Sequence, residues 1–91
     1  MKDTYWDTCE IGSLIKRYAL CLADEHEPTT YHETPFFIDR LPKWAKWGRE
    51  LGLYSLRDTR LIVDGSYKEI ARFRLLAPAK AEAERLAKEE R

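Results

Sequence analysis

The chain contains no asparagine and no glutamine, the side chains that usually read adenine through paired hydrogen bonds. Its four glycines stand apart, so no glycine-rich loop is present to hold a phosphate. Three serines and two histidines indicate no serine–histidine–aspartate arrangement. No apolar run approaches the roughly 20 residues that cross a bilayer, and the first residues lack the apolar core of a signal peptide. We therefore expect a cytoplasmic protein without membrane contact.

The sequence has only two cysteines, Cys9 and Cys21. Both fall on a predicted first helix, roughly 18 Å apart at 1.5 Å per residue. A disulfide needs Cα atoms within about 7 Å, so we expect two free thiols. His26 and His32 follow, but zinc ligands usually come in pairs about two to five residues apart, which the cysteines do not match. We expect no metal, no cofactor and no catalytic residue, and hence a binding protein and not an enzyme.

What is present suits one folded domain, residues 1–91, with 44% hydrophobic and 35% charged residues. The net charge is zero, but the charges are separated along the chain. Residues 1–40 carry four basic and eight acidic side chains, a net of −4, and residues 41–76 carry eight basic and four acidic, a net of +4. Residues 77–91 carry four of each. A surface for an anionic partner is therefore expected in the middle of the chain.

Residues 7 to about 26 predict a first helix. Asp7 can cap it, and Glu10 can complete a capping box. Its apolar residues recur at helical spacing; they are Ile11, Leu14, Ile15, Tyr18 and Leu22. Two shorter helices follow, Pro35–Arg40 and Pro42–Leu53, because proline suits the first turn of a helix and Thr34 can cap the first of them. A single kinked helix over residues 35–53 is the alternative.

Residues 60–76 predict a β-hairpin with its turn at Asp64 and Gly65. Ser66 and Glu69 also fit a capping box, which favours a helix instead, but such a helix would scatter its apolar residues around the axis. Pro78 opens a C-terminal helix whose thin apolar stripe either packs on the domain or pairs with a second copy. The expected fold class is α+β and mainly helical: three N-terminal helices, a β-hairpin at about 60–76 and a C-terminal helix.

Residues 34–76 resemble a winged helix-turn-helix domain. The resemblance rests on residues 42–54, with the Leu-Gly-Leu exit at 51–53, and on residues 60–66 with their Asp-Gly turn. It implies that the helix over 42–53 lies in the major groove of double-stranded DNA while the hairpin contacts the backbone. The residues implied to bind nucleic acid are Lys43, Lys46, Arg49, Arg57, Arg60, Lys68, Arg72 and Arg74. The hypothesis is a DNA-binding regulator, with dimerisation through the C-terminal helix.

The alternative hypothesis is a protein-binding adaptor or inhibitor that docks on a larger enzyme. Trp44, Trp47 and Tyr54 would form its contact surface, because aromatic residues dominate interface hot spots. At their helical spacing the two tryptophans also suit a core. Whether these aromatic side chains form an exposed patch discriminates between the two hypotheses.

Overall fold

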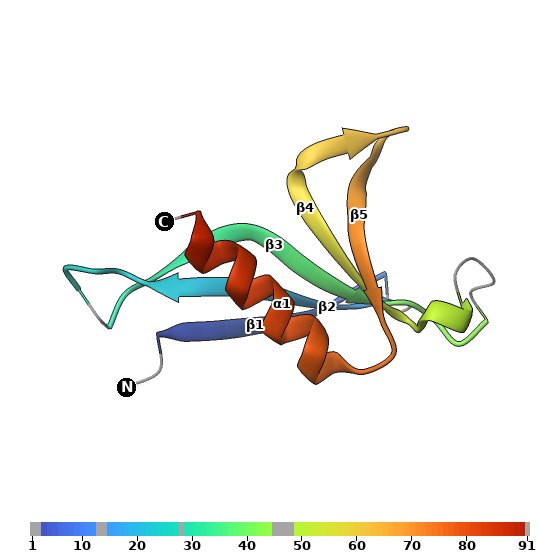
Figure 1. Ribbon diagram of the computed structural model, residues 1–91, viewed down its shortest axis with the longest axis horizontal. Helices are drawn as coiled ribbons and strands as arrows, with labels where there is room; N and C mark the ends of the chain where they lie inside the picture. The colour runs from blue at the N-terminus through green and yellow to red at the C-terminus, as the bar shows by residue number, and fades with distance from the viewer. Residues whose placement is uncertain (1–2, 13–14, 28, 45–48, 91) are drawn as a thin grey trace.

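The computed structural model describes residues 3–12, 15–27, 29–44 and 49–90 of the chain. In this part of the chain it has one antiparallel sheet of five strands and one C-terminal helix (Figure 1). The strands are β1 (Thr4–Ile11), β2 (Ile15–Ala23), β3 (Tyr31–Arg40), β4 (Tyr54–Val63) and β5 (Ser66–Phe73). Each pairs with its neighbour in sequence, so the order is β1-β2-β3-β4-β5. The expectation of a mainly helical domain with three N-terminal helices is therefore wrong.

A hairpin of β1 and β2 stands where the first helix was expected. The helical spacing omits Leu20, which is fully buried, whereas the two-residue period of a strand places it between Tyr18 and Leu22 on one face. Asp7, the expected helix cap, lies exposed in β1 opposite Ala19. In the strand, Tyr18, Leu20 and Leu22 form one buried apolar face. A helix would have placed Leu20 on a different side from the other two.

Strand β3 replaces the second expected helix, Pro35–Arg40. Thr34, expected to cap that helix, instead donates its hydroxyl to the Leu20 carbonyl at 3.0 Å and accepts the Phe36 N–H at 3.2 Å. The β2–β3 ladder is irregular at this point. Pro35 lies at the irregularity, where its missing N–H interrupts no regular ladder bond.

Residues 41–53 connect β3 to β4 and do not form the third expected helix. Within the described part of this connection only η1 (Arg49–Leu51), one turn of 3-10 helix, is helical, and residues 45–48 lie outside the described residues. The Leu41 N–H donates to the Leu53 carbonyl at 2.7 Å and closes the connection at its base. The alternative of one kinked helix over 35–53 is wrong for the same reason.

The β4–β5 hairpin has the expected turn, although β4 begins earlier than predicted. Asp64 and Gly65 both have positive φ, 51° and 78°, as a two-residue turn of type I′ requires. Residues 67–73 are strand, which decides the strand-or-helix alternative. The register shifts between Asp58 and Ile62, and beyond this shift the hairpin bends away from the first three strands (Figure 1).

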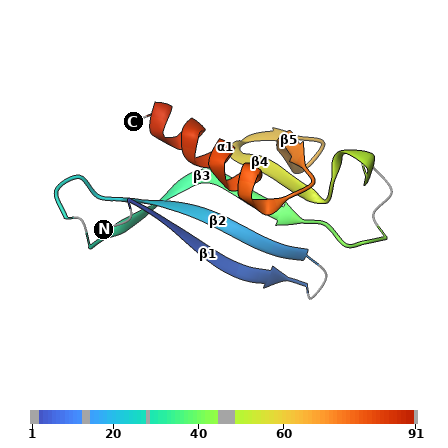
Figure 2. The same cartoon turned by 60° about the horizontal axis from the view of Figure 1, so that its bottom comes forward.

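The C-terminal helix α1 (Leu76–Glu89) lies across one face of the sheet (Figure 2). Its sheet-facing side carries Ala79, Ala83 and Ala87, each at most 5% exposed. These alanines pack on a core of Tyr18, Leu20, Leu22, Phe36, Ile38 and Leu56. The thin apolar stripe therefore packs on the chain's own domain, which is the first of its two expected uses.

Candidate anion-binding site

The residues considered for thiol or metal chemistry do not come together. Cys9 is exposed on β1 and Cys21 is buried on β2, and both are free. Cys21 lies opposite Tyr5, four residues from Cys9 along β1, or about 13 Å at 3.3 Å per residue. The two thiols are therefore far apart because of their positions on the paired strands β1 and β2, and not because they lie along one helix. Among the described residues, no group of three or more His, Cys, Asp or Glu could hold a metal ion.

The histidines and acidic residues between β2 and β3 stabilise a turn. The Asp24 carboxylate lies 2.6 Å from His32 Nε2 and accepts the backbone N–H groups of His26 and Glu27. The bond to His32, followed by these two backbone bonds, holds the Asp24 pKa below its usual value. The cluster is accounted for by local hydrogen bonding at an exposed turn.

Four arginines of the expected DNA-binding surface are held by partners within the chain. Arg57 donates to the Tyr67 carbonyl at 2.7 Å, Arg60 to Asp58 at 2.8 Å and Glu90 at 2.9 Å, Arg72 to Glu69 at 2.7 Å, and Arg74 to the Glu50 carbonyl at 2.7 Å. A guanidinium engaged in this way has fewer donors left for phosphate, and a carboxylate partner offsets its charge. The structure does not assemble these arginines into one basic surface.

The remaining members of the expected surface are divided. Lys43 is exposed after β3, and Lys68 is exposed on β5 opposite Asp58. Lys46 and the side chain of Arg49 lie outside the described residues. Of the expected residues whose side chains the structure describes, Lys43 takes part in the site that follows.

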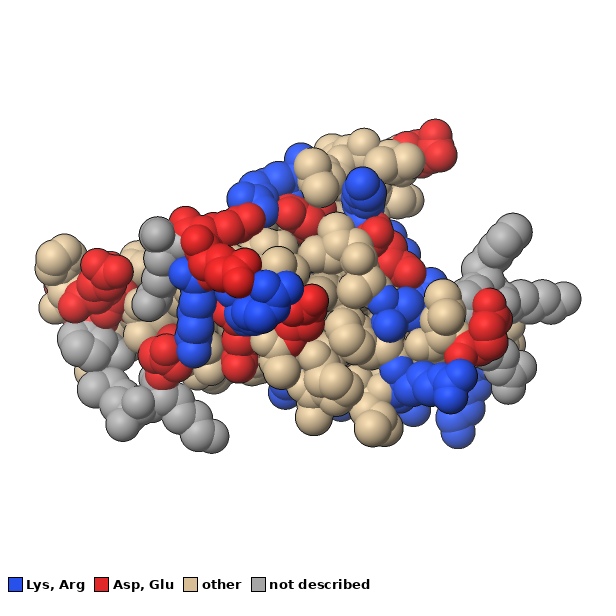
Figure 3. Space-filling view, viewed as in Figure 1, with Lys and Arg blue, Asp and Glu red and all other residues tan. Residues whose placement is uncertain are grey.

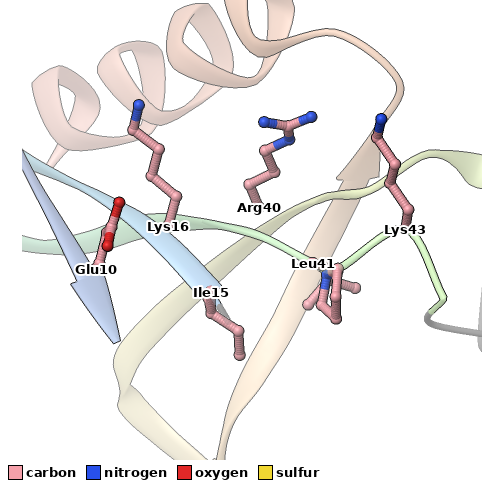
Figure 4. A pocket seen from close by; sticks show the side chains of 7 residues that line it. Glu10, Ile15, Lys16, Arg40, Leu41 and Lys43 are labelled. Carbon is pink, nitrogen blue, oxygen red and sulfur yellow. The ribbon is translucent and has the colours of Figure 1, made fainter. Parts of the chain in front are cut away.

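Three cations gather where β2 begins and β3 ends. Lys16 and Arg40 are direct neighbours in the β2–β3 ladder, which places both side chains on the same face, and Lys43 follows three residues after Arg40. Figure 4 shows the three side chains extending to the same side, toward the helix. They line a hollow of about 400 Å³, together with Glu10, Ile15, Leu41 and Pro42. We refer to Lys16, Arg40 and Lys43 as the cation trio.

The charge of the cation trio is only partly compensated. No member forms an ion pair with a residue in the described part of the chain. Glu10 lines the same hollow and lies opposite Lys16 in the β1–β2 ladder, so one carboxylate accompanies three cations. Like charges held side by side in a sheet destabilise it by roughly a few tenths of a kcal/mol per pair. An anion bound in the hollow would remove this repulsion.

The surrounding surface extends the basic character of the trio. Lys80 of α1 reaches over the Tyr18 ring at 5.4 Å, and Lys16 approaches the same ring at 5.6 Å. In the space-filling view, blue side chains gather beside the connection that follows β3, with a red side chain next to them, and basic and acidic side chains are mixed over α1 (Figure 3). Lys16 and Lys80 approach the same ring, so Lys80 brings a fourth cation close to the trio.

The expected surface misses Lys16 and Arg40 because both were placed on helices in the acidic part of the chain. A two-residue apolar period through 15–23 and 36–40 is the signal that could have found them. Read as adjacent strands, these segments put Lys16 and Arg40 on one face.

The structure describes two of the three aromatic residues of the adaptor hypothesis, and these two differ in exposure. Trp44, next to Lys43, is 67% exposed, whereas Tyr54 is half-buried against the core. Trp47 lies outside the described residues.

Comparisons with protein-family models, with curated proteins and with solved structures found no match for this chain. Among the described residues, no helix has the length and apolar character to cross a membrane.

Proposed function

We propose that this chain is a non-catalytic nucleic-acid-binding protein whose cation trio contacts the phosphate backbone. The observation that carries the proposal is the trio itself: three cations from two strands and a connection, turned to one side around a hollow and forming no ion pair with the residues that the structure describes. Phosphate contacts of this kind are electrostatic and independent of base sequence.

The mode of binding differs from that of a winged helix. That mode needs a recognition helix over residues 42–53, and the described part of this segment holds only the short η1. The contact surface we propose is instead the end of a sheet, which meets the backbone of the ligand. The absence of asparagine and glutamine is consistent with backbone contact in place of base-edge reading.

Lys43→Glu tests the proposal. We expect it to weaken binding of a fluorescent oligonucleotide by roughly tenfold or more at low salt, since it replaces an attraction to phosphate by a repulsion. Three phosphate contacts correspond to a slope of log K against log salt of about −2 to −3, and losing one reduces its magnitude by about one. Fluorescence-anisotropy titrations at several salt concentrations measure both quantities.

Lys68→Glu is the matched control, because Lys68 is an exposed, unpaired cation that does not line the hollow. It makes the same change of net charge and should alter the affinity much less. No binding at low salt, or equal losses in both variants, would contradict the proposal. Preferential binding of a polyglutamate peptide over an oligonucleotide would assign the trio to an acidic protein instead.

A protein-binding adaptor is the second candidate, favoured by apolar side chains exposed along the β4–β5 hairpin. They are Leu61, Ile62, Val63, Tyr67 and Ile70. Leu61 and Val63 lie on one face of the hairpin and Ile62 on the other, since successive side chains of a strand alternate. Exposed apolar side chains gathered in one region mark an interaction site in many proteins. If a partner protein occupies it, capture from lysate will survive nuclease, persist in Lys43→Glu and be lost in a Leu61→Ser, Val63→Ser double variant.

A further inference from the structure

A second hollow, of about 530 Å³, lies between the bent β4–β5 hairpin and the ends of β2 and β3. Its lining is Ile15, Arg17, Phe37, Asp39, Leu41, Arg57, Ile62, Gly65, Ser66 and Tyr67. We call it the hairpin groove. The register shift between Asp58 and Ile62 forms it, because the bend that follows carries Ile62 and Tyr67 over the strands. The Arg60 N–H donates to Asp58 Oδ1 at 2.9 Å and holds the chain at the bend.

The hairpin groove has an aromatic wall, and the charged residues of its lining are Arg17, Asp39 and Arg57. Tyr67 meets the buried Phe37 edge-on, with ring centroids 5.6 Å apart, and stays 40% exposed. The Arg17 guanidinium covers the Phe37 ring at 4.2 Å and forms a two-point ion pair with Asp39. Because Arg17 and Asp39 bind each other, a ligand in the groove would contact mainly the Tyr67 ring and Ile62.

The hairpin groove and the hollow of the cation trio adjoin. Ile15 and Leu41 line both of them. Figure 4 shows Ile15 and Leu41 directed to one side and the trio to the other. The two hollows lie on opposite faces of the sheet, because Lys16 and Arg40 alternate with Arg17 and Asp39 along β2 and β3. A ligand that wraps around this edge therefore passes from the cation trio to a groove with an aromatic wall.

Resting on the proposed function, we infer that the ligand is single-stranded DNA, with phosphates on the cation trio and an unstacked base in the hairpin groove against Tyr67 and Ile62. A volume of about 530 Å³ falls within the range of small-molecule pockets and admits one base but no duplex. Successive bases of a single strand stack on aromatic side chains while cations follow the backbone. Trp44, which follows Lys43 in sequence and is 67% exposed, offers a second stacking surface.

The polar groups of the hairpin groove favour DNA over RNA as the occupant. Arg17 and Asp39 bind each other, and Arg57 donates to the Tyr67 carbonyl. Apart from the Ser66 and Tyr67 hydroxyls, a groove lined in this way offers a ribose 2′-hydroxyl little recognition, which RNA-specific sites commonly supply. An extended peptide is the competing occupant, and tighter binding of the polyglutamate peptide than of the single strand would contradict the inference.

The test measures the affinity of the full chain for a labelled single strand, for its duplex and for the matching RNA strand. We expect the single strand to bind at least tenfold more tightly than the duplex, and RNA to bind no more tightly than DNA. Ile62→Ser and Tyr67→Ser should each weaken single-strand binding roughly fivefold or more, the lower end of one lost base-stacking contact. Tyr67→Phe should keep the wild-type affinity, since it keeps the ring.

Val63→Ser is the matched control: Val63 is the strand neighbour of Ile62, is 51% exposed and does not line the groove. Its affinity should equal that of the wild type, with circular dichroism confirming that every variant folds. Equal affinity for duplex and single strand, or equal effects of Ile62→Ser and Val63→Ser, would overturn the inference. The proposed function would then still stand if Lys43→Glu weakens binding, and it fails by itself if Lys43→Glu has no effect.

Discussion

At the scale of single residues, the number of arginines in a segment is a poor guide to its free positive charge. Glu69 illustrates this, since it accepts hydrogen bonds from both Ser55 and Arg72. Burial acts to raise the Glu69 pKa, but the bonds from Arg72 and Ser55 outweigh it and hold that pKa below its usual value. The basic middle of the sequence is in this way largely consumed by the fold, while Lys16 and Arg40 of the acidic first part remain without ion pairs among the described residues.

Gly52 gives the sharpest prediction at this scale. It is buried, with φ of 113°, and a Cβ at this position would overlap the Phe73 carbonyl. Its own carbonyl accepts a hydrogen bond from Arg72 at 3.1 Å. We expect Gly52→Ala to lower the free energy of unfolding by at least about 2–3 kcal/mol, measured by urea denaturation.

Gly65→Ala separates the clash from the backbone conformation. Gly65 also has positive φ, 78°, but a Cβ there meets nothing within 4 Å. We therefore expect Gly65→Ala to lower the free energy of unfolding by roughly 1–2 kcal/mol, which is the cost of the backbone conformation alone. Equal destabilisation by the two variants would show that overlap with Phe73 plays no part.

At the scale of elements, the residues of the first expected helix fit two periods. Tyr18 and Leu22 are four apart, so they share a face in a helix and also in a strand. The buried Leu20 belongs to the strand pattern alone. Helix α1 packs on the apolar face that the strands form, and its three small alanines let it lie close to that face.

The packing of α1 predicts a difference between two of its alanines. Ala83 is fully buried against the sheet, whereas Ala81 is exposed. Ala83→Leu should destabilise the protein by about 1–3 kcal/mol through overpacking, whereas Ala81→Leu should change stability by less than about 0.5 kcal/mol. Alanine and leucine have similar helix propensity, so packing dominates the difference. Thermal and urea unfolding measure it, and similar values for both variants would contradict the described orientation of α1.

At the scale of the whole molecule, polar contacts fasten the C-terminal helix to distant elements. Arg60 joins Asp58 on β4 to Glu90 just beyond α1, and Trp6 of β1 donates to Glu84 at 3.0 Å. Lys88 pairs with Asp3 at 3.1 Å. The two ends of the chain and the base of the hairpin are thereby linked around one core.

These links predict acid sensitivity. Hydrogen bonds from Arg60 hold the pKa of the buried Asp58 below its usual value. A carboxylate with a lowered folded-state pKa stabilises the protein above its unfolded pKa of about 4, and this contribution is lost as pH falls through the folded-state value. We expect the free energy of unfolding to decrease below about pH 4, and to decrease less in Asp58→Asn.

Urea unfolding at two pH values, one near neutrality and one below about 4, measures this effect. Asp24, Glu69 and Glu82 also have lowered pKa values. Their contribution to the pH dependence of the free energy of unfolding is the same in the wild type and in Asp58→Asn. The difference between the two proteins therefore reports Asp58. An identical pH dependence in both would mean that Asp58 contributes nothing.

The sequence by itself determined the features whose causes lie within a few residues. The turn follows from the Asp64-Gly65 pair, which tolerates the positive φ that such a turn needs. The C-terminal helix follows from its run of helix-forming residues, but it begins at Leu76, two residues before Pro78, which was expected to open it. The exposed position of Trp44 and the site at Lys16 had no such local cause. The binding role rested on the lack of catalytic residues, and the nucleic-acid hypothesis rested on the winged-helix resemblance and the basic middle of the chain; both stay predictions.

Only the tertiary structure decided the fate of residues 4–40 and of the charges. Strand pairing is non-local: Tyr18 and Leu22 become strand residues because β1, β3 and α1 cover them, and no neighbour in sequence encodes that. Whether a cation is free depends likewise on which carboxylate the fold brings to it. Arg60 acquires Asp58 and Glu90, whereas Lys16 lies between Glu10 and Arg40, because β1 and β3 flank β2. The juxtaposition of Lys16 and Arg40 is the basis of the anion site that we propose.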